Sequence, residues 1–229
     1  GQAVRRLRPL KSGIELDSEN ASGQATTWQA EQVLLALPPR LVTSSLSFSP
    51  PLPQALAAEW HATATWMAPH AKYVAVYEQP FWREQGLSGT AFSPYELSHE
   101  AYDNTNHGDE RGTLVGFVSD QNADDVFRLS AEERKERILE SLSHYYGPEA
   151  RNPIVYYESD WGSEEWTRGA YAASFDMGGL HRYGSDLRTP VGPIHFACSD
   201  MAGAGYQHVD GAIRMGRHAA AAIVESAQR

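Results

Sequence analysis

Residues 130–146 carry the clearest helix signal in this sequence, and segments with strand patterns lie on both sides of them. Ser130 and Glu133 form a capping-box pattern at the start, and Gly147 ends the segment. The residues that recur along one helical face are Ile138, Leu142 and Tyr145. A long helix among strands supports a fold that mixes helices and sheets.

The strand patterns are short and are separated by Gly, Asn and Ser turn signals. We expect strands over residues 3–8, 13–17, 24–30, 32–37, 72–78, 113–118, 154–158 and 194–197. Two further helices are expected over 54–61 and about 210–227, whereas the polar segment 98–112 is expected to be a surface loop. This mixture predicts an α+β (mixed α/β) fold.

Charge and cysteine content exclude several classes of protein. The net charge of −10 and the isoelectric point near 5.3 argue against a nucleic-acid surface, which needs clustered Lys and Arg. Cys198 is the only cysteine, so an internal disulfide scaffold and a cysteine-based zinc site are excluded. No apolar run approaches the roughly 20 residues that would span a membrane. We expect a cytoplasmic protein without a membrane span.

Four stretches, taken in order, carry a family resemblance. They are VLLALPPR at 33–40, Lys72 with QPFWR at 79–83 and GLSG at 86–89, DW at 160–161 with EW at 165–166 and GAY at 169–171, and LRTPVGPIHFA at 187–197 with VDGAIRMG at 209–216. Together they resemble the flavin monoamine oxidase family, which includes monoamine, polyamine and L-amino-acid oxidases. The resemblance covers essentially the whole chain.

The resemblance implies a fold, a cofactor and a reaction. Residues 1–55 and 164–229 would belong to a discontinuous FAD-binding domain, and residues 56–163 to a substrate domain with a mixed β-sheet flanked by helices. A small-molecule amine would be oxidised to an imine by hydride transfer to FAD, and hydrogen peroxide would form on re-oxidation. The FAD would be non-covalent, because Ala170 stands where some members attach it through a cysteine.

Lys72 matches the family lysine that holds a water molecule near the reactive flavin nitrogen. The strand pattern places it on one face with Val74 and Val76, so we expect partial desolvation and a lowered pKa. The alternative is a lysine whose stem reaches solvent at the edge of a strand.

Aromatic positions complete the expected cavity. By resemblance, Trp166 and Tyr171 line the substrate cavity and Trp161 lies on the flavin side, where flat rings exclude water. Ordinary core packing is the alternative for all three, and especially for Trp161. His208 stands where the family often has a further aromatic residue that completes the wall of this cavity.

The closing segment predicts a strand, a small-residue turn and a helix. The free N–H groups and the positive end of that helix suit the electron-rich edge of a flavin. By family match, Ser199 and Asp200 approach the phosphate and ribityl region, while Val209 and Asp210 contact the cofactor. The family's Gly-Thr-Glu is replaced by Cys198-Ser199-Asp200. This places a side chain at the position where the family's backbone comes closest to the cofactor.

The family's opening Gly-x-Gly-x-x-Gly motif has no counterpart here, and GAGYQH at 203–208 lacks its third glycine. We therefore expect a missing N-terminal FAD-binding segment or a companion chain, and no tight FAD complex with these residues alone. The second hypothesis is a non-catalytic scaffold that kept the fold without flavin. No metal site is expected, because His99, Glu100 and their polar neighbours fit no zinc spacing.

Overall fold

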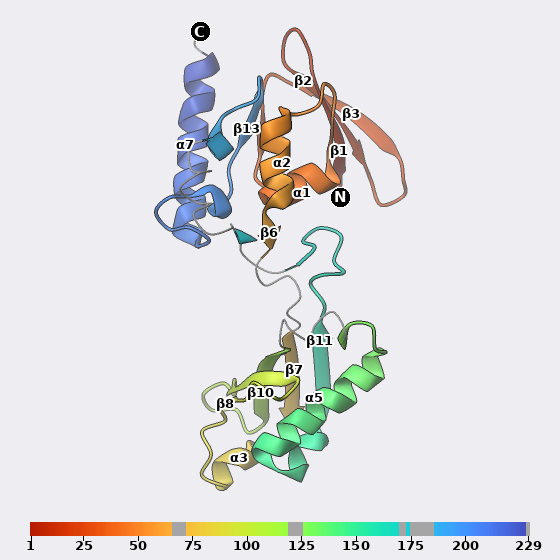
Figure 1. Ribbon diagram of the computed structural model, residues 1–229, viewed down its shortest axis with the longest axis vertical. Helices are drawn as coiled ribbons and strands as arrows, with labels where there is room; N and C mark the ends of the chain where they lie inside the picture. The colour runs from red at the N-terminus through yellow and green to blue at the C-terminus, as the bar shows by residue number, and fades with distance from the viewer. Residues whose placement is uncertain (66–71, 119–125, 170–172, 175–185, 228–229) are drawn as a thin grey trace. The chain divides into compact units, whose positions relative to one another are not determined.

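The computed structural model describes residues 1–65, 72–118, 126–169, 173–174 and 186–227 (Figure 1). It divides into two compact units. The first unit comprises Gly1–Trp66 and Tyr171–Arg229, and the second comprises Met67–Ala170. The described residues contain both helices and sheets, which confirms the α+β fold class.

The first unit begins with a four-stranded sheet in the order β3-β2-β1-β5. β1 (Ala3–Pro9), β2 (Ile14–Glu19) and β3 (Ala25–Ala30) are antiparallel, and β5 (Ser47–Phe48) pairs in parallel with β1. Successive side chains along these strands point to opposite faces of the sheet. One face buries Leu7 and Ile14, and on the other face Arg8 pairs with Glu15 and Asp17.

Segments from the two ends of the sequence meet in this unit. β4 (Val33–Leu35) pairs in parallel with β13 (Ile194–Phe196), and β6 (Ala64–Thr65) pairs antiparallel with β12 (Ala173–Ser174). The helices are α1 (Pro39–Ser45), α2 (Gln54–Ala62), the 3₁₀ turns η2 (Asp186–Arg188) and η3 (Ser199–Met201), and α7 (Val209–Ala227). Trp60 packs edge-on against Phe196 at 4.6 Å between ring centres, and Met215 joins the same core.

The second unit is a five-stranded sheet in the order β11-β7-β10-β9-β8. Its strands are β7 (Lys72–Tyr77), β8 (Ala91–Phe92), β9 (Ser98–Asp103), β10 (Gly112–Val118) and β11 (Val155–Ser159). Every described pair in this sheet is antiparallel, and the parallel pairs of the chain lie in the first unit. Short helical segments are α3 (Phe81–Glu84) and η1 (Pro148–Arg151).

Helix α5 (Ala131–Tyr146) packs along one face of this sheet (Figure 1). Its capping box forms as predicted: the Glu133 N–H donates to Ser130 Oγ, and the Ser130 N–H donates to Glu133 Oε2. Ile138 and Leu142 are fully buried against strand residues that include Tyr73. This packing decides which face of the sheet is covered within the unit and which is left open.

The prediction of a surface loop over 98–112 is wrong for its first part. Ser98–Asp103 forms β9, which lies between β10 and β8 in the sheet. The ladder shifts register between Phe117 and Val118, which is a β-bulge opposite His99. The bulge interrupts the period-two alternation by which strands are recognised in a sequence.

Candidate functional site

The face of the second-unit sheet opposite α5, called here the outer face, carries aromatic, aliphatic and charged side chains. On β7 the buried residues Tyr73, Ala75 and Tyr77 point to the helix, so the intervening residues point the other way. The outer face is formed by Lys72, Val74, Val76, Phe92, Glu100, Tyr102, Val115, Phe117, Val155 and Tyr157.

Lys72 and Glu100 lie in one cross-strand row of the outer face. Phe117 is the register partner of both, with Lys72 on one side and Glu100 on the other. The Lys72 ammonium nitrogen lies 5.3 Å from the centre of the Phe117 ring. Lys72 is exposed, so the partial desolvation expected from the strand pattern is not seen in this unit. The row therefore carries a lysine and a glutamate on strands whose backbones are about 10 Å apart, which is two interstrand spacings.

Glu100 is a functional candidate that sequence reasoning placed in a polar loop. Its side chain is only 20% exposed. Oε2 accepts a hydrogen bond of 2.7 Å from the Tyr102 hydroxyl, and Oε1 lies 3.8 Å from His99 Nε2. The regular ladder from Asp103 to Glu100 places this carboxylate on the outer face, and the bulge at His99 lies next to it. The signal available in the sequence was the spacing of Glu100 and Tyr102, which share a face in any strand.

Trp161 and Trp166 follow β11, whose last residue Ser159 is the register partner of Lys72. Asp160 Oδ1 accepts from the Gly162 N–H at 3.0 Å, and the Gly169 N–H donates to the Trp161 carbonyl at 2.6 Å. Trp161 is 41% exposed and Trp166 is 56% exposed. Core packing within this unit therefore does not account for either ring. Tyr171, like Ala170, lies outside the described residues.

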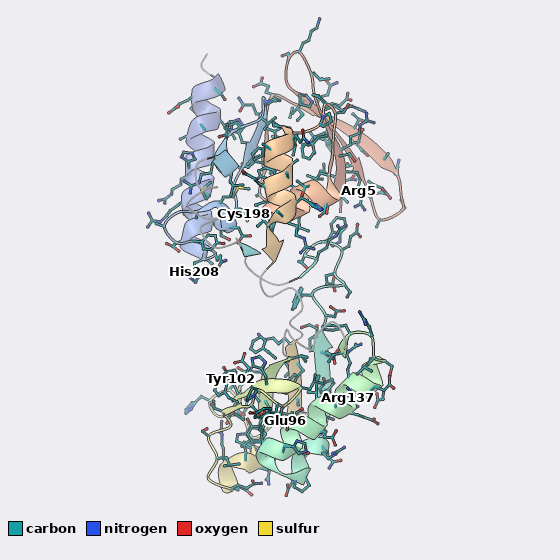
Figure 2. The ribbon with its side chains drawn as sticks, viewed as in Figure 1. Arg5, Glu96, Tyr102, Arg137, Cys198 and His208 are labelled. Carbon is teal, nitrogen blue, oxygen red and sulfur yellow. The ribbon has the colours of Figure 1, made fainter. Side chains whose placement is uncertain are left out.

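The remaining predicted residues come together in the first unit, where β13 leads through η3 into α7. Ser199 and Asp200 lie in η3, and Asp200 is 6% exposed. The Ser199 carbonyl accepts from the Gln207 N–H at 3.1 Å, which closes the turn onto itself. Figure 2 labels Cys198 and also His208, which immediately precedes the first residue of α7.

The start of α7 presents backbone donors. The Ala212 N–H donates to the carbonyl of His208, the residue before the helix, at 3.1 Å. The N–H groups of Val209 and Asp210 lie in the turn before, where a helix supplies no partner carbonyl. A Cβ on Gly211 would lie 2.0 Å from the Gly205 carbonyl oxygen, so the turn is pressed against the helix. These donors, at the positive end of the helix, suit an electron-rich ligand.

Cys198 does not have the environment of a nucleophile. Burial and the adjacent Asp200 carboxylate raise the pKa of its thiol to about 11, so the thiol stays protonated at neutral pH. Its Sγ donates to Asp200 Oδ2 at 3.7 Å.

Two other classes of site were searched for across the described ranges. No three His, Cys, Asp or Glu side chains gather there in a way that could hold a metal ion. Among the helices described, none combines the length and apolar character needed to cross a membrane.

Comparison with known proteins gives consistent matches along the chain. The model of the family described as flavin containing amine oxidoreductase matches residues 1–224. Putrescine oxidase from Kocuria rosea is 64% identical over 227 residues, which cover 96% of this chain and 47% of the relative. A solved structure of putrescine oxidase bound to putrescine has a TM-score of 0.84 and 57% identity, and covers 98% of this chain and 48% of that chain.

A more distant structure has the same fold. Cyclohexylamine oxidase from Brevibacterium oxydans has a TM-score of 0.81 at 31% identity, and covers 99% of this chain and 48% of that chain. The chain spans about half the length of the curated relatives it matches.

Proposed function

This chain belongs to the family of flavin containing amine oxidoreductases, and we propose that it forms part of an FAD-dependent oxidase of short aliphatic diamines. The observation that carries the proposal is the 64% identity to putrescine oxidase over 96% of this chain. Because the chain spans about half of that relative, the activity is proposed for the flavin-loaded protein.

The start of α7 and the turn before it are proposed to hold the flavin. The N–H groups of Val209 and Asp210 would donate to the electron-rich edge of its ring, and Ser199 and Asp200 would approach its ribityl and phosphate region. When bound, the flavin supplies a hydride acceptor for the amine α-carbon, and its re-oxidation by oxygen yields hydrogen peroxide. The flavin is proposed to be non-covalent, since Ala170 offers no thiol.

The two ends of the Lys72–Glu100 row are proposed to orient the diamine. A carboxylate attracts an alkylammonium through charge-assisted hydrogen bonds, so Glu100 would bind the distal, protonated amine. A lysine ammonium disfavours a second positive charge nearby, so the amine closer to Lys72 would lose its proton more readily. The neutral amine is the form whose α-carbon can give up hydride. Lys72 would also hold a water molecule by hydrogen bonding.

The exposed rings that follow β11 are proposed to exclude water from the substrate. They are Trp161 and Trp166, and β11 is paired with the strand that carries Lys72. A dry cavity strengthens the attraction between Glu100 and an ammonium group.

The domain assignment follows the same proposal. Residues 56–163 would form the substrate domain, and residues 1–55 and 164–229 would contribute to the FAD-binding domain. The rest of that domain would be supplied by a further segment or by a companion chain.

The test is anaerobic mixing of the flavin-loaded protein with putrescine or with butylamine, which lacks the second amine. We expect putrescine to bleach the flavin absorbance at far lower concentration than butylamine, and Glu100→Gln to remove most of this difference. Failure of the full-length protein to retain flavin would favour a non-catalytic scaffold. Retained flavin with equal response to both amines would reject the diamine assignment.

A further inference from the structure

The carboxylate of Glu100 is held by a side chain from its own strand. The Tyr102 hydroxyl donates to Glu100 Oε2 at 2.7 Å, and the two residues are neighbours on the outer face of β9. Figure 2 labels Tyr102 in the second unit. This bond occupies one carboxylate oxygen and leaves Oε1 for another donor.

Tyr102 is itself fixed from two directions. Its register partner on β10 is Val115, and its ring packs edge-on against Phe92 of β8, with 5.7 Å between ring centres and an interplanar angle of 85°. Phe92 in turn is the register partner of Glu100. Tyr102 therefore contacts both the Glu100 carboxylate and the Phe92 ring, and these two partners lie opposite each other on neighbouring strands.

We propose that Tyr102 is a positioning residue that holds the Glu100 carboxylate in the orientation needed to receive the distal ammonium of a diamine. This inference rests on the proposed function, because it assigns the geometry of the diamine-binding carboxylate. Tyr102 does not need to touch the substrate in this role.

The physical argument concerns the freedom of a glutamate side chain. A glutamate with no fixed partner loses rotamer entropy when it binds a ligand. The Tyr102 hydroxyl restricts Glu100 beforehand, so less freedom is lost on binding. The hydrogen bond to Glu100 raises the pKa of Tyr102, with burial adding to the effect, so the phenol keeps the proton it donates. Removing the hydroxyl should weaken only the binding that uses Glu100.

The consequence separates diamines from monoamines. A diamine uses Glu100 for its second ammonium, whereas a monoamine has no group to place there. Loss of the Tyr102 hydroxyl should therefore raise KM for the diamine and leave the monoamine unaffected. A role in folding alone would change both substrates together.

The test is steady-state kinetics of the flavin-loaded enzyme with putrescine and butylamine. For Tyr102→Phe we expect KM for putrescine to rise about tenfold, with kcat for putrescine and both butylamine parameters within about twofold of wild type. Tyr95→Phe is the matched control, because Tyr95 is 93% exposed at the β8–β9 connection, and it should change neither substrate.

A double-mutant cycle completes the experiment. In a Glu100→Gln background, Tyr102→Phe should add little, because the group that it positions is already neutral. If Glu100→Gln removes diamine selectivity but Tyr102→Phe does not, the positioning role is rejected and the proposed function stands. If neither change alters selectivity, the positioning role of Tyr102 and the diamine-binding role of Glu100 are both rejected. Equal losses for both amines in Tyr102→Phe would also reject the positioning role.

Discussion

The ammonium nitrogen of Lys72 lies 5.3 Å from the centre of the Phe117 ring on the adjacent strand β10. A cation over an aromatic face at an exposed site gains about 0.5–1 kcal/mol. This contact keeps the lysine head over the outer face, where it shares a row with Glu100. The position of the Lys72 charge is thus set by the sheet.

Replacing Lys72 should slow the reaction without unfolding the protein. For Lys72→Met in the flavin-loaded enzyme, we expect flavin reduction or re-oxidation to slow by about tenfold or more, since a positioned proton donor or water-binding group contributes on that scale. Stopped-flow absorbance measures both rates, and thermal unfolding tests the fold. Lys135→Met is the control, because Lys135 lies on α5 and pairs only loosely with Glu132 at 3.6 Å. Unchanged rates in Lys72→Met would remove Lys72 from the mechanism.

Gly116 should not tolerate a larger residue. A Cβ at this position on β10 would lie 2.1 Å from the Tyr73 hydroxyl oxygen and 2.5 Å from the Glu100 carbonyl oxygen. We expect Gly116→Ala to lower the free energy of unfolding by about 1–3 kcal/mol, because the backbone of β9 must move. Urea unfolding measures the change.

The control for this prediction is Gly216→Ala in α7, where an added Cβ meets nothing within 4 Å. Alanine is favoured over glycine in a helix by about 1 kcal/mol, so this change should stabilise the chain or be neutral. Equal stability of Gly116→Ala and wild type would show that β9 and β10 are less tightly packed than the structure indicates.

Asp103 should make the stability of the second unit depend on acid pH. Its side chain is 12% exposed, and burial alone would raise its pKa. Hydrogen bonds from Arg83, Thr105 and Trp82 outweigh burial and lower the pKa of Asp103 from 3.8 to about 2. A lowered folded-state pKa contributes stability above the unfolded pKa, and this contribution is lost as the pH falls toward the folded value.

For Asp103→Asn we therefore expect a loss of about 1–2 kcal/mol in unfolding free energy at neutral pH, after allowance for the exposure of Arg83. The difference from wild type should shrink as the pH is lowered from about 4 toward 2. Denaturant unfolding at several pH values measures it. Asp109→Asn, in the exposed turn nearby, is the control and should show no such trend. A difference that stays constant down to pH 2 would contradict the role of the Asp103 charge.

Several elements were predictable because their signals are local. The helix over Ala131–Tyr146 follows from its capping box, and its observed limits differ by one residue from those predicted. β7 matches the alternation of Lys72–Tyr77, and α7 begins within one residue of the predicted start. The family resemblance rested on four short sequence stretches in a fixed order, and the family model matches residues 1–224.

The candidate site was only partly predictable. Lys72 could be found from the sequence, but its exposure depends on which face of β7 meets α5. Glu100 was not found, although its spacing from Tyr102 was an available signal, because the bulge at His99 interrupts the strand pattern of β9. The importance of Tyr102 depends on a hydrogen bond that strand propensity does not predict.

The sequence by itself determined the principal helices and most of the longer strands, β9 excepted, and the family to which the chain is related. Capping, alternation and motif residues lie within short stretches of chain, so these signals are local. The tertiary structure alone decided that Lys72, Phe117 and Glu100 form one row. Strand register brings together residues far apart in the sequence, and it is fixed by backbone hydrogen bonds and by the buried face of the sheet. The chemistry proposed for the outer face depends on that register.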